Sequence, residues 1–235
     1  AIAALRIMGE NRVKGGGVAN RADIGSQAIN GVAKLHSRLI TTEVFPQFFA
    51  LMPDRFQNKT NGVTPRRWIN QANPGLAHLI TERLGGDVPW LVDLALLRSL
   101  EMHISDPAFL EAWRAVKHAN KVRLAEYARK VLHVDVRTDA FFDVQIKRIH
   151  EYKRQLMNCL YCVRRYLDIK RMAPAEGERV VPRVVFIAGK AAPAYWMAKR
   201  IIKLIHRVGA VVNNDPEVGD LLKVLFIPNY NVSAA

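Results

Sequence analysis

The sequence predicts an α/β fold, in which parallel strands form an open sheet and helices form the connections. Three apolar runs in the C-terminal half have strand character, at residues 141–146, 184–188 and 224–227. Helical patterns lie between them, and this alternation is typical of parallel βαβ units. Because ligands of such sheets bind beyond the carboxyl ends of the strands, we expect a site in the residues that follow these runs.

The N-terminal half begins with a flexible-loop signal, residues 15–17, which are all glycine. A helix is then predicted from Ser26 to about Ile40, with Ser26 as a candidate cap. Its apolar residues recur at helical spacing; they are Ala28, Val32, Leu35 and Leu39. An apolar patch at residues 45–52 follows, and Pro53 ends it.

Residues 54–75 are predicted to form an ordered loop, because they are rich in turn formers and show little periodicity. A helix is expected to start at Asn73-Pro74-Gly75 and to end at Gly85-Gly86. Residues 106–131 indicate another helix, whose inward-facing side chains are expected to be Phe109, Trp113, Val116, Val122 and Tyr127.

Two more helices are predicted between the strands. The first starts at Glu151, and its apolar residues fall at i, i+4, i+7 and i+11; they are Leu156, Leu160, Val163 and Leu167. Residues 173–182 are expected to form a loop. The second helix follows the turn at Gly189-Lys190, with Pro193 as an early helical residue. Residues 211–212 form a further short apolar run.

Composition excludes several classes of protein. The 235 residues are 50% hydrophobic and 24% charged, which is enough apolar material for a core and argues against general disorder. The length allows one or two domains. Two cysteines are too few for a disulfide scaffold, and no apolar run is long enough to cross a bilayer.

The charge balance points to an anionic partner. Lys and Arg outnumber Asp and Glu by 35 to 21, a formal net charge of +14. Such a surface meets nucleic acid, anionic lipid or phosphorylated small molecules. A basic α/β module that binds nucleic acid is therefore one hypothesis, although the aromatic residues do not interleave with a basic strip as in a stacking platform.

The densest cation cluster lies at residues 147–154, Lys-Arg-Ile-His-Glu-Tyr-Lys-Arg. It joins a predicted strand to the start of a predicted helix, the end that carries partial positive charge. Four crowded cations there are unfavourable unless an anion binds among them and to the free backbone N–H groups. Both a phosphate site and a solvated cationic helix start remain open.

Two other segments are weaker candidates. The turn at residues 189–193 lacks the glycine spacing of a phosphate loop, so a tight turn that packs a helix on the sheet is the favoured interpretation. The loop from Asn58 to Trp68 offers mixed donors and acceptors suited to sugar hydroxyls, or it is a well-satisfied structural loop.

Cys159 and Cys162 lie in an apolar helical stretch and are interpreted as core thiols. The histidines lack metal spacing, so no metal site is expected.

Taken together, these segments resemble the α-glucan phosphorylase family of glycogen, starch and maltodextrin phosphorylases. The resemblance covers the chain from about residue 24 onward. The matching runs are residues 25–37, 56–68, 73–76, 142–158, 189–193, 215–220 and 229–233, and their most specific parts are residues 58–68 and 147–154.

The resemblance implies a two-lobe Rossmann-like glycosyltransferase architecture of the GT-B type, which this chain covers only in part. Residues 1–60 are expected to form the end of the N-terminal lobe. Residues 61–235 are expected to form the first part of the C-terminal lobe. The chain starts without Met and stops shortly after a predicted strand, so we expect it to belong to a longer protein. The expected location is the cytoplasm, or a plastid if the protein is plant-like.

The resemblance also implies an activity and a cofactor. Inorganic phosphate attacks the non-reducing end of an α-1,4-glucan, and glucose 1-phosphate leaves with retained configuration. The cofactor is pyridoxal 5′-phosphate, which acts through its own phosphate group. The lysine that forms the Schiff base is expected outside residues 1–235. The whole enzyme is expected to be a homodimer, without nucleic-acid or membrane partners, and this piece alone is expected to be inactive.

Site roles follow from the resemblance residue by residue. Arg148, Lys153 and His150 resemble catalytic groups, the first two holding the substrate phosphate. Asn61, Gln27, Tyr152 and Tyr195 resemble substrate-binding residues, Tyr195 being the aromatic at the mouth of the cleft. Cofactor-pocket contacts are expected from Trp68, Lys147, Lys153, Tyr230 and Val232.

The chain departs from the family pattern at two positions. Gln27 stands where the family usually has His, so it can form hydrogen bonds but cannot carry a charge. Asn231 stands where the animal enzymes have Arg, which indicates a bacterial or plant-like member.

Overall fold

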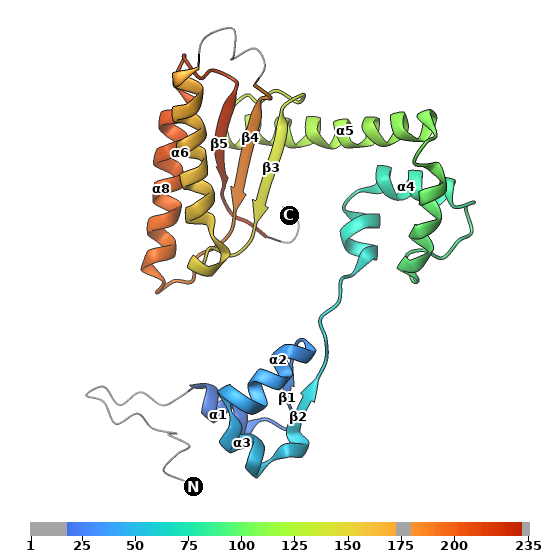
Figure 1. The fold of residues 1–235 in the computed structure, drawn as a ribbon, viewed down its shortest axis with the longest axis vertical. Coiled ribbons are helices and arrows are strands. Elements are labelled where there is room, and N and C mark those ends of the chain that lie inside the picture. The colour runs from blue at the N-terminus through green and yellow to red at the C-terminus, as the bar shows by residue number, and fades with distance from the viewer. Residues whose placement is uncertain (1–17, 173–179, 232–235) are drawn as a thin grey trace. The chain divides into compact units, whose positions relative to one another are not determined.

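The computed structural model describes residues 18–172 and 180–231 (Figure 1). The chain divides into two compact units. The first runs to Pro74 and includes Leu91–Asp93, and the second comprises Gly75–Trp90 and the residues from Leu94 onward. The lobe boundary expected at residue 60 concerns a longer protein and stays a prediction.

The first unit is a small two-stranded parallel sheet with short helices. Its elements are α1 (Val18–Gly25), β1 (Ile29–Gly31), α2 (Lys34–Leu39), a π-helical turn (Ile40–Val44), α3 (Pro46–Leu51), a 3-10 turn (Pro53–Arg55) and β2 (Phe56–Asn58). β1 and β2 pair in parallel, Ile29 beside Phe56 and Gly31 beside Asn58.

The helix predicted from Ser26 to Ile40 is wrong in its first half. Residues 29–31 form β1 instead, and the Ser26 hydroxyl donates to the Ala22 carbonyl at the end of α1 rather than capping a later helix. Gly31 packs so closely on α2 that a Cβ there would lie 2.1 Å from the Ser37 hydroxyl oxygen. Pairing with a strand 27 positions away thus overrides the local helical spacing.

The loop expected at residues 54–75 is ordered but contains regular pieces. β2 occupies its start, residues 59–64 have no regular structure, and a π-helical segment covers Arg66–Gln71. α4 (Pro74–Arg83) starts and ends where the sequence predicts. Gly85 and Gly86 then both adopt positive φ, +97° and +84°, the left-handed conformation that glycine adopts without strain.

The long helix predicted at residues 106–131 is confirmed as α5 (Pro107–Leu132). Asp106 caps it by accepting a hydrogen bond from the Ala108 backbone N–H at 2.9 Å, as an N-cap aspartate does. A 3-10 segment, Leu94–His103, precedes it.

The parallel sheet of the second unit confirms the predicted fold class. β3 (Phe141–Ile146), β4 (Arg183–Ala188) and β5 (Leu222–Ile227) lie in that order and pair in parallel. Their register aligns the carboxyl ends, with Ile146 beside Ala188 and Ala188 beside Ile227. β4 is the most buried strand, because the other two flank it and helices cover both of its faces.

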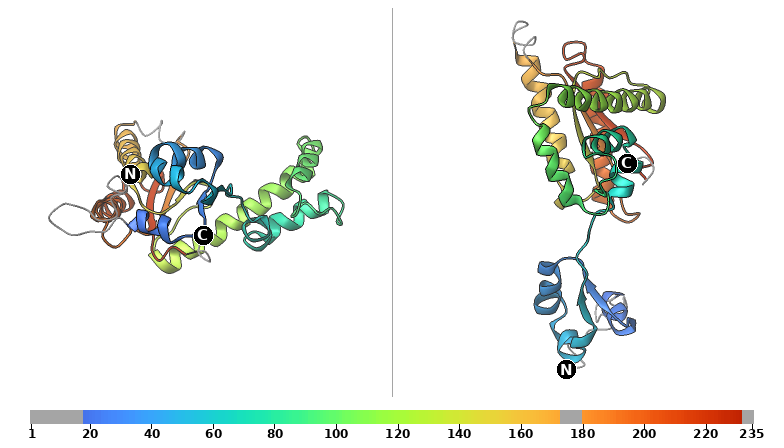
Figure 2. Two further views of the ribbon diagram at one scale, coloured as in Figure 1. Left: turned by 90° about the horizontal axis from the view of Figure 1, so that it is seen from below. Right: turned by 90° about the vertical axis from the view of Figure 1, so that its right-hand side faces the viewer.

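Two helices cover one face of this sheet and α5 approaches the other (Figures 1 and 2). α6 (Gln155–Arg171) starts four residues later than predicted, after a 3-10 turn at Glu151–Lys153. α8 (Trp196–Asn213) starts after Pro193, so that proline is not helical. The apolar run at residues 211–212 belongs to α8 and is not a separate element.

Separate hydrophobic cores lie on the two faces. The first joins α6 and α8 to the sheet and includes Cys159, Ile187 and Ile201; the second joins the end of α5 to the sheet and includes Ala128 and Phe186.

Cys159 and Cys162 are free, buried thiols, as predicted, and burial raises the pKa of Cys162 to about 12. Residues 173–179 of the expected loop lie outside the described residues. In the described part of the chain, no helix meets the length and hydropathy that a membrane span requires.

Candidate functional site

The candidate site lies at the carboxyl edge of the three-stranded sheet. Lys147 follows β3, Gly189 follows β4 and Tyr230 lies three residues beyond β5. Because the strands are parallel and in register, segments that are distant in the sequence meet at this edge. This is where an open α/β sheet binds its ligands.

The backbone of residues 147–154, called here the cation loop, is held to the neighbouring strand. The Lys147 N–H donates to the Ala188 carbonyl at 3.0 Å, and the Ile149 N–H donates to the Lys190 carbonyl at 3.1 Å. The Ile149 side chain is 2% exposed and belongs to the first core. One apolar residue therefore anchors a loop that is otherwise charged.

Gly189 allows these segments to approach each other. A Cβ at this position would lie 1.9 Å from the Lys147 carbonyl oxygen, a separation that no side chain tolerates. The role of Gly189 in this turn is therefore steric, because the lack of a side chain lets the cation loop lie against β4. This favours the tight-turn interpretation of residues 189–193 over a phosphate loop.

The cations of the loop are left available to solvent. Lys147, Arg148 and Arg154 are exposed, and the Lys153 ammonium lies 5.6 Å from the ring centre of Tyr152. None of the four forms an ion pair with a carboxylate of residues 18–172 or 180–231. Four neighbouring cations without an ion-pair partner in the described residues form a set of donors that suits phosphate groups.

Glu151, the single acid of the loop, is engaged elsewhere. Its carboxylate accepts a hydrogen bond from the Tyr195 hydroxyl, and its backbone N–H donates to the same hydroxyl oxygen at 3.3 Å. The bond to the carboxylate is the main reason that the pKa of Tyr195 is raised. Glu151 thus joins the two loops at the sheet edge instead of neutralising its neighbouring cations.

Three aromatic rings gather at the same place. The His150 ring centre lies 4.4 Å from that of Tyr152 and 4.9 Å from that of Tyr195. The structure therefore brings together the side chains of four residues that the sequence singled out, His150, Tyr152, Lys153 and Tyr195. Arg148 lies on the same loop, two residues before His150.

The first unit carries three other candidates, Gln27, Asn61 and Trp68, and all three are exposed. The Asn61 backbone N–H donates to the Val32 carbonyl at 2.9 Å, which attaches the loop of residues 59–64 to the end of β1. Trp68, 47% exposed, lies on the π-helical segment.

The remaining cofactor-pocket candidates lie after β5. Tyr230 packs on the second core of the sheet, and Asn229 before it has a positive φ of 54°. Val232 lies outside the described residues.

Sequence reasoning missed Gln155, the first residue of α6. Its side chain is fully buried, and it bonds to the backbone of Arg148 and His150. The position of Gln155 directly after the cation cluster could have indicated a link between the two. However, a glutamine at a helix start is ordinarily solvated, and nothing in the sequence indicates that it turns into the core.

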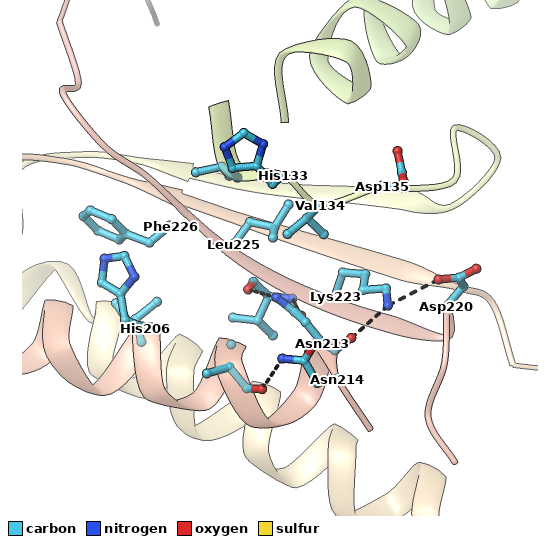
Figure 3. Close-up of a pocket in the computed structure, with 15 residues that line it drawn as sticks. His133, Val134, Asp135, His206, Asn213, Asn214, Asp220, Lys223, Leu225 and Phe226 are labelled. Carbon is cyan, nitrogen blue, oxygen red and sulfur yellow. Dashed lines mark hydrogen bonds and ion pairs between the residues drawn. The ribbon is translucent and has the colours of Figure 1, made fainter. Parts of the chain in front are cut away.

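A sizeable cavity lies away from these residues. It has a volume of about 480 Å³ and runs along the outer edge of β5, between the ends of α5 and α8 (Figure 3). There Asn213 pairs with the Val224 backbone through both amide atoms, at 2.8 and 2.9 Å. This pairing provides hydrogen-bond partners for the outward-facing N–H and carbonyl groups of Val224 at the edge of β5. The site candidates do not line the cavity.

No cluster of three or more His, Cys, Asp or Glu able to hold a metal ion occurs among residues 18–172 and 180–231. The chemistry that these residues offer is the binding of anions.

Comparison with known proteins identifies relatives over nearly the whole chain. The family model described as "Carbohydrate phosphorylase" matches residues 1–235, so the similarity also covers the residues before 24. "Glycogen phosphorylase 2" of Dictyostelium discoideum is 56% identical over 99% of this chain and 23% of its own length. "Glycogen phosphorylase, liver form" of Ovis aries is 49% identical over 98% of this chain and 27% of its own length.

A plant protein gives a similar result. "Alpha-glucan phosphorylase 2, cytosolic" of Arabidopsis thaliana is 48% identical over 93% of this chain and 26% of its own length. The chain therefore spans about a quarter of the length of the curated relatives it matches.

Proposed function

The chain belongs to the carbohydrate phosphorylase family, and we propose that a longer protein containing it catalyses the phosphorolysis of an α-1,4-glucan. Inorganic phosphate would attack the anomeric carbon of the terminal glucose at the non-reducing end. The products would be α-D-glucose 1-phosphate, with retained configuration, and a glucan one residue shorter. Membership of the family favours this function over the nucleic-acid-binding module.

The observation that carries the proposal is the cation loop at the carboxyl edge of the sheet. Arg148 and Lys153 are assigned to hold the substrate phosphate. A guanidinium can bind two phosphate oxygens at once, whereas an ammonium acts as a point charge. Their charge would stabilise the oxygens as the glycosidic bond breaks. The backbone of the cation loop is already held by hydrogen bonds, so little backbone reorganisation is needed when the anion binds.

Lys147 and Lys153 are assigned to the phosphate group of pyridoxal 5′-phosphate. The fit rests on the donor set of the loop, which has no described carboxylate partner. When bound, the cofactor would supply a phosphate group that exchanges a proton with the substrate phosphate. Trp68, Tyr230 and Val232 are assigned to the rest of its pocket.

The sugar would be held by residues of the cation loop, by Tyr195 and by two residues of the first unit. His150 and Tyr152 are assigned to the glucose site from the cation loop, with Tyr195 at its mouth. Asn61 and Gln27 are assigned to hydroxyl groups of the glucan. Because Gln27 stands where the family usually has His, it can supply hydrogen bonds to a hydroxyl but no positive charge.

Partners and location follow from the same assignment. We propose inorganic phosphate and an α-1,4-glucan as substrates and a homodimer as the assembly. The cytoplasm is the proposed location, supported by the relative named as cytosolic; a plastid is the alternative for a plant-like member.

The decisive test is an assay of the full-length protein, loaded with cofactor, for release of glucose 1-phosphate from maltodextrin and inorganic phosphate. Arg148→Ala is expected to lower kcat/KM by at least about 100-fold, because a donor to the developing charge is lost. A folded, cofactor-loaded protein that releases no glucose 1-phosphate would contradict the proposal. Steep salt-dependent binding of duplex DNA or RNA would instead support the nucleic-acid hypothesis.

A further inference from the structure

Gln155 is unusual among the polar residues of the chain. It and Asp23 are the two buried polar or charged side chains of the described residues, and Gln155 is the deeper one, with 0% exposure. Burying a carboxamide is unfavourable unless each of its polar atoms finds a partner. Its partners therefore indicate what the residue does.

Both polar atoms of the Gln155 side chain bind the cation loop. The Nε2 amide donates to the Arg148 carbonyl oxygen at 3.1 Å. The Oε1 oxygen accepts a hydrogen bond from the His150 backbone N–H at 3.3 Å. One side chain thus holds the backbone on either side of Ile149, between a phosphate-binding candidate and a sugar-binding candidate.

A second amide supports the far end of the same loop. The Gln145 Nε2 amide donates to the Lys153 carbonyl oxygen at 3.0 Å, and Asn158 donates to the Gln145 Oε1 oxygen at 3.0 Å. All of these groups lie in the second unit. The backbone beneath Arg148 and Lys153 is therefore fixed by buried and half-buried side chains.

We infer that Gln155 is a positioning residue for the anion site, holding the Arg148–His150 backbone so that the Arg148 and Lys153 side chains converge on one phosphate. This inference rests on the proposed function for the identity of the anion. It assigns Gln155 no contact with substrate or cofactor.

The two contacts explain why an amide is required at this position. A carboxamide combines one donor and one acceptor in a single plane, which matches the Arg148 carbonyl and the His150 N–H. A hydrocarbon side chain of the same length would leave both backbone groups buried without partners. The loop would then shift to reach water, and Arg148 would move with it.

The test compares Gln155→Met with Asn213→Leu in the full-length, cofactor-loaded protein. Asn213 is the matched control, because its amide pairs with the Val224 backbone in the same two-bond manner along the edge of β5. Both variants remove a doubly bonded amide from the same sheet unit. Of the two residues, Gln155 alone touches the cation loop.

The expected result is a higher KM for phosphate that a loss of folding stability does not explain. Gln155→Met should raise the KM for phosphate by about tenfold or more, since displacements of about 1 Å can cost 100-fold. The KM for the glucan should rise as well, because Gln155 also holds the backbone of His150, which is assigned to the glucose site. Asn213→Leu should lower the melting temperature but leave both KM values unchanged.

Hydrogen exchange provides a readout that does not depend on activity. Gln155→Met should accelerate exchange of the 147–154 backbone amides, the His150 amide above all, whereas Asn213→Leu should accelerate exchange in β5. If Gln155→Met does not fold, Gln155→Asn is the second variant. It keeps an amide that is one methylene shorter, so it can reach only one of the two backbone groups.

The outcomes separate the two proposals. Equal phosphate KM values in Gln155→Met and Asn213→Leu, with an active wild type, would overturn the positioning role and leave the proposed function intact. An inactive wild type would contradict the proposed function instead. In that case unchanged exchange of the cation loop in Gln155→Met would overturn the inference, and faster exchange would support it.

Discussion

The two segments that carry most of the candidate site residues differ in how they are held. The cation loop of the second unit is attached to β4, α6 and the segment before α8 by backbone and side-chain bonds. The segment 58–68 of the first unit has mostly exposed side chains, and its Asn61 is attached through one backbone bond to Val32. The backbone of the proposed phosphate site is therefore held by buried and half-buried partners within the second unit, whereas the proposed sugar-binding segment is held mainly near its start, where Lys59 and Asn61 bond to the end of β1.

The largest expected effect is at Gly189, beside the cation loop, and it is compared with Gly62 of the segment 58–68. Gly189→Ala should lower the free energy of unfolding by about 3 kcal/mol or more, because the new Cβ would overlap the Lys147 carbonyl. Gly62→Ala is the matched control. A Cβ at Gly62 would meet no atom of the described residues within 4 Å beyond its chain neighbours, so its effect should stay within about 0.5 kcal/mol.

Urea unfolding of both glycine variants tests this contrast. Similar midpoints for Gly189→Ala and Gly62→Ala would mean that the cation loop is no more tightly packed than the segment 58–68, and the comparison would fail.

The next effect concerns the pH dependence of the second unit. Asp215 accepts hydrogen bonds from the Tyr166 hydroxyl, at 2.6 Å, and from Lys170, at 2.9 Å. These bonds lower its pKa from 3.8 to about 2. Because the folded pKa lies below the unfolded one, Asp215 stabilises the fold above about pH 4, and this stabilisation is lost as the pH falls toward 2.

Asp215→Asn should therefore reduce stability at pH 7 and flatten the decline between pH 4 and 2. Thermal unfolding across this range measures both effects. An unaltered slope in the variant would show that other carboxylates govern the acid sensitivity of the unit.

A smaller effect is expected at Arg154, which precedes α6 with a left-handed φ of 65°. Arg154→Val should destabilise the protein by about 1–2 kcal/mol, because a β-branched residue is strained in this region. Arg154→Gly should be neutral within about 0.5 kcal/mol, since glycine adopts this conformation freely. Chemical denaturation distinguishes the two variants; equal stability would mean that the positive φ is not maintained in solution.

The smallest effect on stability is expected at Asn61. Its exposed side chain makes no hydrogen bond to another residue of the described ranges, so Asn61→Ala should change the free energy of unfolding by less than about 0.5 kcal/mol. The KM for the glucan should nevertheless rise in the full-length enzyme. A clear loss of stability would show that segment 58–68 is held as firmly as the cation loop.

The sequence determined the features that depend on local pattern. Apolar runs marked the three strands of the parallel sheet, proline and glycine signals gave the bounds of α4, the pattern of inward-facing residues gave α5, and the crowding of charge marked the cation loop. These features could be predicted because residues a few positions apart encode them.

Only the tertiary structure decided the features that depend on distant partners. β1 replaced a predicted helix because residues 56–58 offered it a parallel strand. Gln155 turned inward because the Arg148 carbonyl and the His150 N–H needed partners beneath a buried Ile149. Glu151 bonded to Tyr195, 44 positions away, instead of neutralising its neighbouring cations. The partners of β1 and of Glu151 lie 27 and 44 positions away and meet only when the chain has folded. The partners of Gln155 lie only five and seven positions away, but the packing of Ile149 into the core, and not a local pattern, turns the side chain toward them.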